Sequence, residues 1–366
     1  MMNERGKKTF KLLDKYLGIP ILFALKLFSK KKELPKNIEK IGILTVPAIG
    51  DIILLTGFLR DIKNFNQDIK IILFVSEEVK EIAEIMGSYD EIVSIELYRP
   101  LRVVKTLRLH PVDVFIDAAQ WARFNAILTF FSKSKFKIGF RTKGQCKHLI
   151  FDYSVEHSSL IHELFNYKKL SFLSEIITNS LPAVKLSSNI PVIKDRIVIH
   201  TMPSGYLSVL KEWPAENWAI IIEFLLARKY EIFFTGSGSD RKSIDNLLHR
   251  NKNNPGLYNV AGKYSIKETV NLLKSSGLVI SVNTGIMHLA SVLGCNLIAL
   301  HGPTDPKRWG PLNENSIVIQ SDYSQAPCLN LGFEYNCKDR SGECMKRITP
   351  EMVINEIEKM IDNESI

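Results

Sequence analysis

The sequence predicts an α/β protein with two doubly wound parallel sheets, one in each half of the chain. Three observations lead to this prediction. Short apolar strands alternate with helical segments, the alternation stops at a stretch bracketed by prolines, and it then begins again. Repeated strand–helix units of this length form parallel sheets that helices cover on both faces. A chain of 366 residues is also long enough for two domains of ordinary size.

The N-terminal half contains the first series of strands and helices, in residues 39–181. Its strands are continuous apolar runs, which is typical of strands buried on both faces. They are expected at residues 40–46, 69–75, 91–95, 112–117 and 136–140. The helices that follow them are expected at residues 51–62, 79–86, 100–109, 121–131 and 160–178.

A linker is predicted at residues 182–195, because this stretch lacks a periodic pattern and lies between prolines. The second series fills residues 196–348, and a closing helix is expected within 349–366. The strands are expected at 196–200, 230–234, 277–281, 296–300 and 317–320, and the helices at 216–228, 240–250, 265–275 and 350–361. Ligands of such folds bind at the carboxyl ends of the strands, so we expect a cleft between the two sheets.

Residues 1–38 form a basic segment with amphipathic character. The first 40 residues contain 11 Lys and Arg against 4 acidic residues, whereas the remaining chain has 37 basic and 35 acidic residues. The apolar run at residues 17–28 is shorter than the roughly 20 residues of a membrane-spanning helix. Lys30, Lys31 and Lys32 follow it, and this pattern favours binding to an anionic membrane surface. The alternative is a solvated tail with one helix packed on the body.

The five cysteines are too few, and odd in number, for a disulfide framework, which favours a reducing compartment. Cys328, Cys337 and Cys344 have the spacing C-x8-C-x6-C. Zinc sites use tighter pairs and a fourth ligand, so a structural or local role is favoured over a metal site.

The stretch 282–290, Val-Asn-Thr-Gly-Ile-Met-His-Leu-Ala, marks the point where a buried strand turns into a helix. The first N–H groups of a helix lack internal partners and lie at the positive end of its dipole, so they bind phosphate groups. Thr284 can cap this helix, Gly285 lets a ligand approach the backbone, and His288 lies one turn further along the same face. The pattern predicts a site for an anionic nucleotide.

Five motifs occur in a fixed order along the chain. Pro-Ala-Ile-Gly-Asp at 47–51 follows the first strand, Lys-Glu-Trp-Pro lies at 211–214, and Gly-Ser-x-x-Asp at 236–240. The helix start at 283–290 is the fourth, and Gly-Pro-Thr-Asp-Pro-x-x-Trp-Gly-Pro at 302–311 is the fifth. Over about residues 40–361 the chain resembles glycosyltransferase family 9, the ADP-heptose:lipopolysaccharide heptosyltransferases. The resemblance implies a GT-B fold, in which an N-terminal Rossmann-like acceptor domain faces a C-terminal Rossmann-like nucleotide-sugar domain across a cleft.

The resemblance makes Asp51 the candidate catalytic base. Inverting sugar transfer needs a carboxylate that takes the proton from the acceptor hydroxyl as this hydroxyl attacks the anomeric carbon. Asp51 is expected at the start of the helix after the first strand, where a plain helix cap is an equally common role for an aspartate. Asp117, at the end of the fourth strand, is the rival carboxylate, and a packed or capping role is favoured for it.

The resemblance also implies a set of residues that bind the donor, namely Lys211, Gly236, Ser237, Asn283, Thr284, Gly285 and His288. Lys211 is the candidate cation for the charge of the departing diphosphate, with a solvated loop lysine as the alternative. For His288 the alternative is a buried helix histidine, and for Gly236 and Ser237 an ordinary turn. The family has an acidic residue where this chain has Asn283, and an amide hydrogen-bonds without carrying charge.

Residues that could meet the acceptor are expected in the N-terminal half. Gly50 belongs to the turn before Asp51, and Arg123 and Arg141 follow the fourth strand. The two arginines could contact phosphates of a lipid-linked acceptor, or they could be part of a solvated face. No D-x-D sequence occurs, which argues against a metal-dependent reaction, and no cofactor is expected besides the nucleotide-sugar substrate.

These features predict an inverting, metal-independent glycosyltransferase of lipopolysaccharide biosynthesis. It would move a heptose from ADP-heptose onto a lipopolysaccharide-core-type glycolipid, as a cytoplasmic protein peripheral to the inner membrane of a bacterium. One alternative is a GT-B enzyme that uses another nucleotide sugar for a different surface glycan. The other is a non-catalytic, nucleotide-binding protein attached to a membrane. Nucleic acid is not an expected partner, because the basic charge is confined to the first 40 residues.

Overall fold

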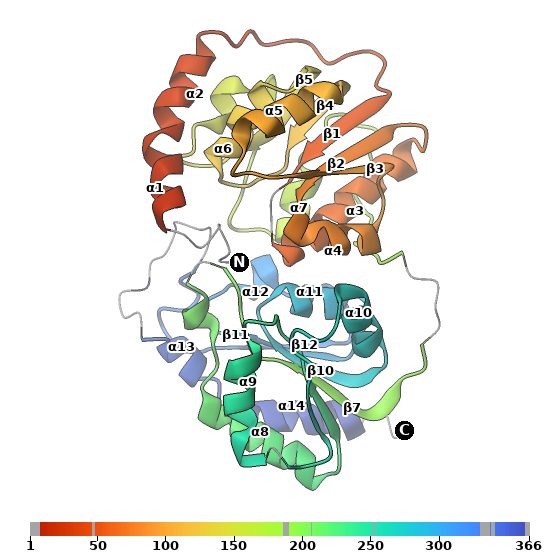
Figure 1. Cartoon of the computed structure of the whole chain (residues 1–366), viewed down its shortest axis with the longest axis vertical. Helices are drawn as coiled ribbons and strands as arrows, with labels where there is room; N and C mark the ends of the chain where they lie inside the picture. Colours follow the sequence, from red (N-terminus) through yellow and green to blue (C-terminus); the bar gives the residue numbers. More distant parts are fainter. Residues whose placement is uncertain are drawn as a thin grey trace. The chain divides into compact units, whose positions relative to one another are not determined.

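A computed structural model describes residues 8–45, 48–185, 190–205, 207–251, 253–329, 337 and 341–362. The chain divides into two compact units, Met1–Lys185 (unit 1) and Leu186–Ile366 (unit 2). Each unit contains one six-stranded sheet in which all neighbouring strands are parallel. Helices cover both faces of each sheet (Figure 1). The predicted α/β class with two parallel sheets is confirmed.

In unit 1 the strands lie in the order β3-β2-β1-β4-β5-β6. They are β1 (Lys40–Leu44), β2 (Lys70–Ser76), β3 (Glu91–Ile95), β4 (Val112–Asp117), β5 (Ser134–Arg141) and β6 (Tyr153–Glu156). The helices are α1 (Lys8–Tyr16), α2 (Gly18–Lys26), α3 (Ile49–Phe65), α4 (Lys80–Met86), α5 (Pro100–Leu109), α6 (Arg123–Phe130) and α7 (Glu163–Lys168), with 3₁₀ turns η2 (Glu77–Val79) and η3 (Lys147–Ile150). The sequence did not indicate β6, which is short and lies at the edge of the sheet.

Each face of the unit 1 sheet is buried by its own helices. Val103 of α5 and Leu128 of α6 pack with Phe74 and Phe115 of the sheet. On the opposite face, α3 contacts both α4 and α7 (Figure 1). Burial of one such side chain stabilises the fold by about 1.5–3 kcal/mol, so the sheet is a firm support for the loops at its strand ends.

In unit 2 the strands lie in the order β12-β11-β10-β7-β8-β9. They are β7 (Ile193–His200), β8 (Glu231–Phe234), β9 (Leu257–Asn259), β10 (Ser276–Val282), β11 (Leu297–His301) and β12 (Ser316–Gln320). The helices are α8 (Ala215–Ala227), α9 (Arg241–Leu248), α10 (Ile266–Lys274), α11 (Gly285–Val292), α12 (Pro306–Trp309), α13 (Glu343–Lys346) and α14 (Pro350–Asp362), with 3₁₀ turns η4 (Ser208–Lys211) and η5 (His249–Asn251).

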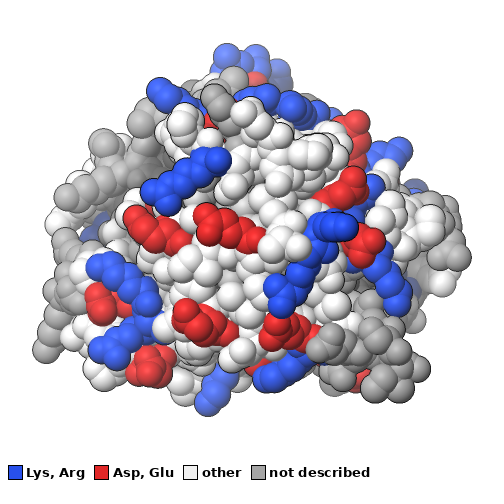
Figure 2. Space-filling view, turned by 90° about the horizontal axis from the view of Figure 1, so that it is seen from below, with Lys and Arg blue, Asp and Glu red and all other residues white. Residues whose placement is uncertain are grey.

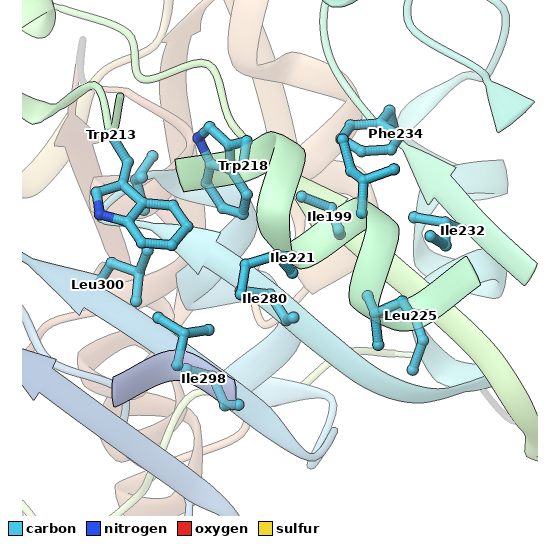
Figure 3. Packing of buried hydrophobic residues seen from close by; sticks show 14 of the residues in the cluster. Ile199, Trp213, Trp218, Ile221, Leu225, Ile232, Phe234, Ile280, Ile298 and Leu300 are labelled. Carbon is cyan, nitrogen blue, oxygen red and sulfur yellow. The ribbon is translucent and has the colours of Figure 1, made fainter. Parts of the chain in front are cut away.

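A large apolar cluster holds α8 and the turn before it on the unit 2 sheet. Trp213 and Trp218 pack edge to face, with ring centroids 4.7 Å apart, and Figure 3 shows them in one cluster with Leu225 and Ile280. Trp213 Nε1 also donates a hydrogen bond of 2.7 Å to the carbonyl oxygen of Ile348. The tryptophan of the Lys-Glu-Trp-Pro motif therefore anchors η4, the turn that ends in the lysine of the same motif.

The helix predicted at residues 160–178 is wrong in its length, because α7 ends at Lys168. Lys168 Nζ lies 2.9 Å from the carboxylate of Asp61, which belongs to α3. The other carboxylate oxygen of Asp61 accepts the N–H of Ser180 at 2.9 Å. Contacts with α3 thus replace the hydrogen bonds of a longer helix, and apolar periodicity alone does not reveal such contacts.

The described part of the N-terminal segment forms α1 and α2, which pack on α6 and η3. Leu22 is fully buried there. Asp14 accepts hydrogen bonds from Arg123 Nη1 at 3.1 Å and from the N–H of Phe124 at 2.9 Å, so its carboxylate caps α6 from a distant part of the chain. Part of the segment is therefore packed on the body. None of the described helices is long and apolar enough to cross a membrane.

Charged side chains of both signs are mixed on the face of the molecule in Figure 2. The described residues of that face show no broad area of one sign. This mixture agrees with the near balance of 37 basic and 35 acidic residues beyond residue 40. It gives no support to a nucleic-acid surface on that face.

We predict that Asp14→Ala releases α1 and α2 from unit 1. The change leaves the buried guanidinium of Arg123 without its carboxylate, which costs about 3 kcal/mol and makes local opening about a hundredfold more frequent. Limited trypsin digestion should then cut faster at Lys15 and Lys26. The control is Asp68→Ala, because the Asp68 side chain is exposed. Equal cleavage rates of Asp14→Ala and the wild type would contradict the prediction.

Candidate functional site

Asp51 lies on the first turn of α3, directly after the central strand β1 of unit 1. Its Oδ2 accepts the N–H of Ala48 at 3.0 Å, which is the capping contact expected of an aspartate at this position. Its Oδ1 accepts hydrogen bonds from Gln120 Nε2 at 2.9 Å and from the hydroxyl of Tyr167 at 3.1 Å. The residue is partly exposed. Besides capping the helix, its carboxylate therefore has two side-chain contacts that a helix cap does not require.

Asp117, the rival carboxylate, is fully buried at the end of β4. Its Oδ1 accepts the N–H of Ala119 at 2.9 Å, and Lys147 Nζ lies 2.9 Å from its Oδ2. Burial raises the pKa of Asp117, and the charge of Lys147 opposes this increase. Of the packed or capping role that the sequence favoured for Asp117, the structure confirms the packed one.

The three candidate acceptor residues differ in their exposure and in their contacts. Arg123 is 3% exposed, and its guanidinium is bound to Asp14 and to the carbonyl oxygen of Gly144, which argues against the expected contact with an acceptor. Arg141 is exposed at the end of β5. Gly50 is buried in the first turn of α3, where its backbone rather than any side chain could approach a ligand.

In unit 2, α11 begins directly after the central strand β10. Thr284 is its N-cap, and the Thr284 hydroxyl accepts the N–H of Met287 at 3.3 Å. Gly285 is the first residue of the helix. The predicted strand-to-helix junction and the capping role of Thr284 are thus confirmed, and the helix terminus has the geometry of an anion site.

Lys211 reaches this junction from η4. Its Nζ donates hydrogen bonds to the carbonyl oxygens of Ser204 at 3.0 Å and Asn283 at 3.4 Å. Both partners are neutral, and burial lowers the pKa of Lys211 from its usual 10.5 to about 8. Burial also lowers the pKa of His301, at the end of the neighbouring strand β11, to about 4. An incompletely solvated ammonium group next to a helix N-terminus is suited to a phosphate ligand.

Asn283 and His288 both connect this junction to α12. Asn283 Nδ2 donates to the carbonyl oxygen of Trp309 at 3.2 Å, a bond that an ionised aspartate could not donate. The buried His288 ring lies edge-on to the Trp309 ring, with centroids 6.4 Å apart. Asn283 therefore has a structural task next to Lys211, and the packing of His288 matches the buried helix histidine that the sequence left as an alternative.

Gly236 and Ser237 form a turn after β8, next to β7 in the sheet. The N–H and the hydroxyl of Ser237 both donate to Asp240 Oδ2, at 2.7 and 2.6 Å. Ser237 is exposed. The turn lies at the same edge of the sheet as Lys211, and its own hydrogen bonds are those of an ordinary turn before a helix.

The cysteines and the other metal-binding side chains give no metal centre in the described ranges. Among the residues described, no three His, Cys, Asp or Glu side chains form a group that could hold a metal ion. Cys328 and Cys344 are buried thiols, and burial raises the pKa of Cys328 to about 12.

Sequence reasoning missed Gln120 and Tyr167, the two side chains that bind Asp51. Gln120 follows β4, which is the neighbour of β1 in the sheet, so a polar residue three places after the end of a central strand was a usable signal. Tyr167 lies inside the apolar stretch that was predicted as one long helix, and periodicity does not distinguish it from a core residue.

Comparison with known proteins gives consistent matches. The sequence profile of glycosyltransferase family 9 (heptosyltransferase) matches residues 101–338. Lipooligosaccharide heptosyltransferase 2 of Haemophilus influenzae is 23% identical over 266 residues, which are 65% of this chain and 73% of that protein. Lipopolysaccharide heptosyltransferase 3 of Escherichia coli is 25% identical over 348 residues, 86% of this chain and 96% of that protein.

Solved structures show the same fold. The ADP-heptose lipopolysaccharide heptosyltransferase II of E. coli has a TM-score of 0.72 at 19% identity, over 89% of this chain and all of that one. An E. coli heptosyltransferase solved with ADP has a TM-score of 0.67 at 18% identity, over 88% of this chain and 99% of that one. The architecture of two six-stranded parallel sheets with flanking helices is the GT-B fold of these proteins.

We predict that the affinity of unit 2 for ADP falls as the pH rises through about 8. Lys211 loses its proton in this range in the empty site, and only the ammonium form attracts the diphosphate, so the dissociation constant rises by up to about tenfold per pH unit. Isothermal titration calorimetry between pH 6.5 and 9.5 measures this change. The Lys211→Met variant should bind ADP more weakly, and its dissociation constant should not rise above pH 8. Because the ADP is the same in both titrations, this comparison distinguishes the loss of the Lys211 proton from the titration of ADP itself. A constant affinity of the wild type between pH 7 and 9.5 would contradict the prediction.

Proposed function

The chain belongs to glycosyltransferase family 9, and on that premise we propose that this glycosyltransferase moves a heptose from ADP-heptose onto a lipopolysaccharide-core-type glycolipid. The proposal includes inversion at the anomeric carbon and no requirement for a metal ion. The observation that carries it is the meeting of the partly buried Lys211 ammonium with the capped N-terminus of α11. This pair of groups is suited to hold and stabilise a departing diphosphate.

The donor half of the reaction would take place at the α11 terminus. As the bond between the anomeric carbon and the diphosphate oxygen breaks, negative charge grows on that oxygen. The Lys211 ammonium and the first N–H groups of α11 are fixed cationic and dipolar groups, so they stabilise this charge without rearranging. Neutral partners around Lys211 leave its charge available for the phosphate.

The acceptor half would take place at Asp51. The acceptor hydroxyl attacks the anomeric carbon on the face opposite to the leaving diphosphate, which inverts the configuration there. The hydroxyl proton passes to the Asp51 carboxylate, a new glycosidic C–O bond forms, and ADP leaves. The contacts of Gly50 and Arg141 with the acceptor remain part of this proposal, whereas Arg123 is assigned to holding α1.

We also propose that the protein works at the surface of an anionic membrane, as a peripheral cytoplasmic protein. Leu27 and Phe28 at the end of α2 are 83% and 77% exposed. Lys30, Lys31 and Lys32 follow them in the sequence. Apolar side chains enter the interface of a bilayer while nearby lysines bind its anionic head groups. An enzyme with a lipid-linked acceptor gains from such binding, because it meets its substrate in the membrane plane.

Asn283 favours a second candidate, a GT-B enzyme that uses another nucleotide sugar for a different surface glycan. The side chain at this position is an amide that is bonded to Trp309, so it presents no negative charge to donor hydroxyls. A non-catalytic nucleotide-binding protein is the third candidate, and it would bind ADP without transfer or hydrolysis. A thermal-shift series over nucleotide sugars separates the donors, since a bound ligand stabilises the folded chain.

We predict that Asp51→Asn lowers the turnover of ADP-heptose and deacylated core lipid by about 10²–10⁴-fold, as expected for loss of a general base. Product formation can be followed by mass spectrometry. The affinity for ADP should stay at the wild-type value, because the predicted donor residues all belong to unit 2. Wild-type turnover in Asp51→Asn would remove Asp51 from this role, and binding of ADP without any turnover by the wild type would favour the non-catalytic candidate.

We predict that replacing Leu27 and Phe28 together by Ser lowers binding to phosphatidylglycerol vesicles at least about tenfold, because each side chain contributes about 1.5–3 kcal/mol when it leaves water. Vesicle co-sedimentation measures the bound fraction, and added salt should weaken it further. The control is Leu101→Ser, which removes an equally exposed leucine, 86% exposed on α5. Equal binding by the double variant and the wild type would contradict the proposed surface.

A further inference from the structure

We propose that Gln120 and Tyr167 are positioning residues, which hold the Asp51 carboxylate in the orientation needed to take the acceptor proton. This inference rests on the proposed role of Asp51. The three side chains form a closed triangle. Gln120 Nε2 lies 2.9 Å from Asp51 Oδ1 and 2.9 Å from the Tyr167 oxygen, and the Tyr167 hydroxyl lies 3.1 Å from Asp51 Oδ1.

The triangle joins three separate elements of unit 1. Asp51 belongs to α3, Gln120 to the loop between β4 and α6, and Tyr167 to α7. Gln120 is 69 residues and Tyr167 116 residues away from Asp51 in sequence. Because no local turn brings them together, their meeting depends on the sheet order and on the packing of α7 against α3.

The loop that carries Gln120 is fixed by side chains from elsewhere. The Thr142 hydroxyl donates to the carbonyl oxygen of Gln120, and Lys147 Nζ donates to the carbonyl oxygen of Ala119. Asp117 accepts the N–H of Ala119 at 2.9 Å and forms a buried ion pair with Lys147. Three polar groups of this short loop are thus bound by buried partners, so the loop presents Gln120 in one place.

The helix that carries Tyr167 is fixed in the same way. Glu163 Oε1 lies 2.7 Å from His157 Nε2, and both side chains are buried. Asn166 binds the N–H and the carbonyl oxygen of Ser158 at 2.9 and 2.8 Å. Helix α7 has only six residues, so these contacts rather than its own hydrogen bonds hold it in place. Tyr167 is 1% exposed, and its hydroxyl points to the carboxylate of Asp51.

The capping bond from Ala48 holds only one oxygen of the Asp51 carboxylate. Rotation about the last side-chain bond of an aspartate is soft, so this single bond leaves the plane of the carboxylate poorly defined. Two donors on Oδ1 remove this freedom. A small error in the place of a reacting group lowers the rate by large factors, so the loss of either donor should be visible in turnover.

The test uses variants that remove a donor and keep the shape of the side chain. We expect Tyr167→Phe and Gln120→Met each to lower kcat by about tenfold to a hundredfold, which is the usual effect of one hydrogen bond to a charged group. The KM for the donor and the affinity for ADP should stay at wild-type values. The control is Tyr153→Phe, an exposed tyrosine on β6, which should leave kcat unchanged.

The second arm repeats both substitutions in the Asp51→Asn background. If Gln120 and Tyr167 act through Asp51, the double variants turn over no more slowly than Asp51→Asn alone. Equal further losses in both backgrounds would overturn the inference, since the two residues would then act independently of Asp51. A wild-type kcat in both single variants would also overturn the inference. The proposed function would still stand in that case, provided that the wild type is active and Asp51→Asn is inactive. A parallel fall in ADP affinity would also overturn the inference, because the defect would then extend beyond the Asp51 site.

Discussion

The strand order of each sheet is the constraint on which the rest of the structure depends. In unit 1 the chain adds strands to one side of β1 and then returns to add β4 on the other side, and in unit 2 it does the same at β7 and β10. At such a reversal the connections from two neighbouring strands leave toward opposite faces, so the carboxyl ends of both strands stay uncovered. Asp51 and Gln120 follow β1 and β4, whereas Lys211 and Asn283 follow β7 and β10. In each unit, the candidate residues therefore lie at a strand reversal of the sheet, where the backbone leaves room for a ligand.

Placing a charged side chain near the end of a strand lowers the stability of the folded chain, and the pKa of Lys211 indicates the size of this cost. Its pKa is lowered from 10.5 to about 8 by burial, a difference of about 3 kcal/mol. Because the lowered pKa disfavours the charged form in the folded state, the cost is complete below about pH 8 and decreases as the pH rises toward the usual value. In the proposed donor complex, the bound diphosphate would offset this cost by supplying a negative charge next to Lys211. The apolar cluster around Trp213 and Trp218 can bear such a cost, since it anchors η4 independently of the lysine.

Sequence patterns of a few residues correctly predicted those features of the fold that depend only on neighbouring residues. The strand before Asn283, the cap at Thr284 and the helix start at Gly285 follow from an apolar run, a capping side chain and a glycine, all within a few residues. The long helix predicted at residues 160–178 failed because Asp61 on α3 captures both Lys168 and the backbone of Ser180. Arg123 was expected to meet a ligand and is instead bound to Asp14, 109 residues away. Tyr167 was missed for the same reason, because its contact with Asp51 depends on the packing of distant elements and not on a spacing in the sequence.

Asn283 shows how one substitution changes both the packing and the electrostatics of a site. The amide donates to the carbonyl oxygen of Trp309 and so connects the start of α11 to the end of α12. A carboxylate there would face that carbonyl oxygen without a proton to donate, and would lie close to Lys211 because Lys211 already binds the backbone of the same residue. With an amide at this position, the Lys211 ammonium has no neighbouring carboxylate from residue 283, and in the proposed donor complex the sugar hydroxyls would meet a neutral hydrogen-bonding group there. In the proposed complex with a nucleotide sugar, the amide would thus leave the diphosphate its full attraction to Lys211 and would hold the sugar without charge, which is the physical reason to test several nucleotide sugars as donors.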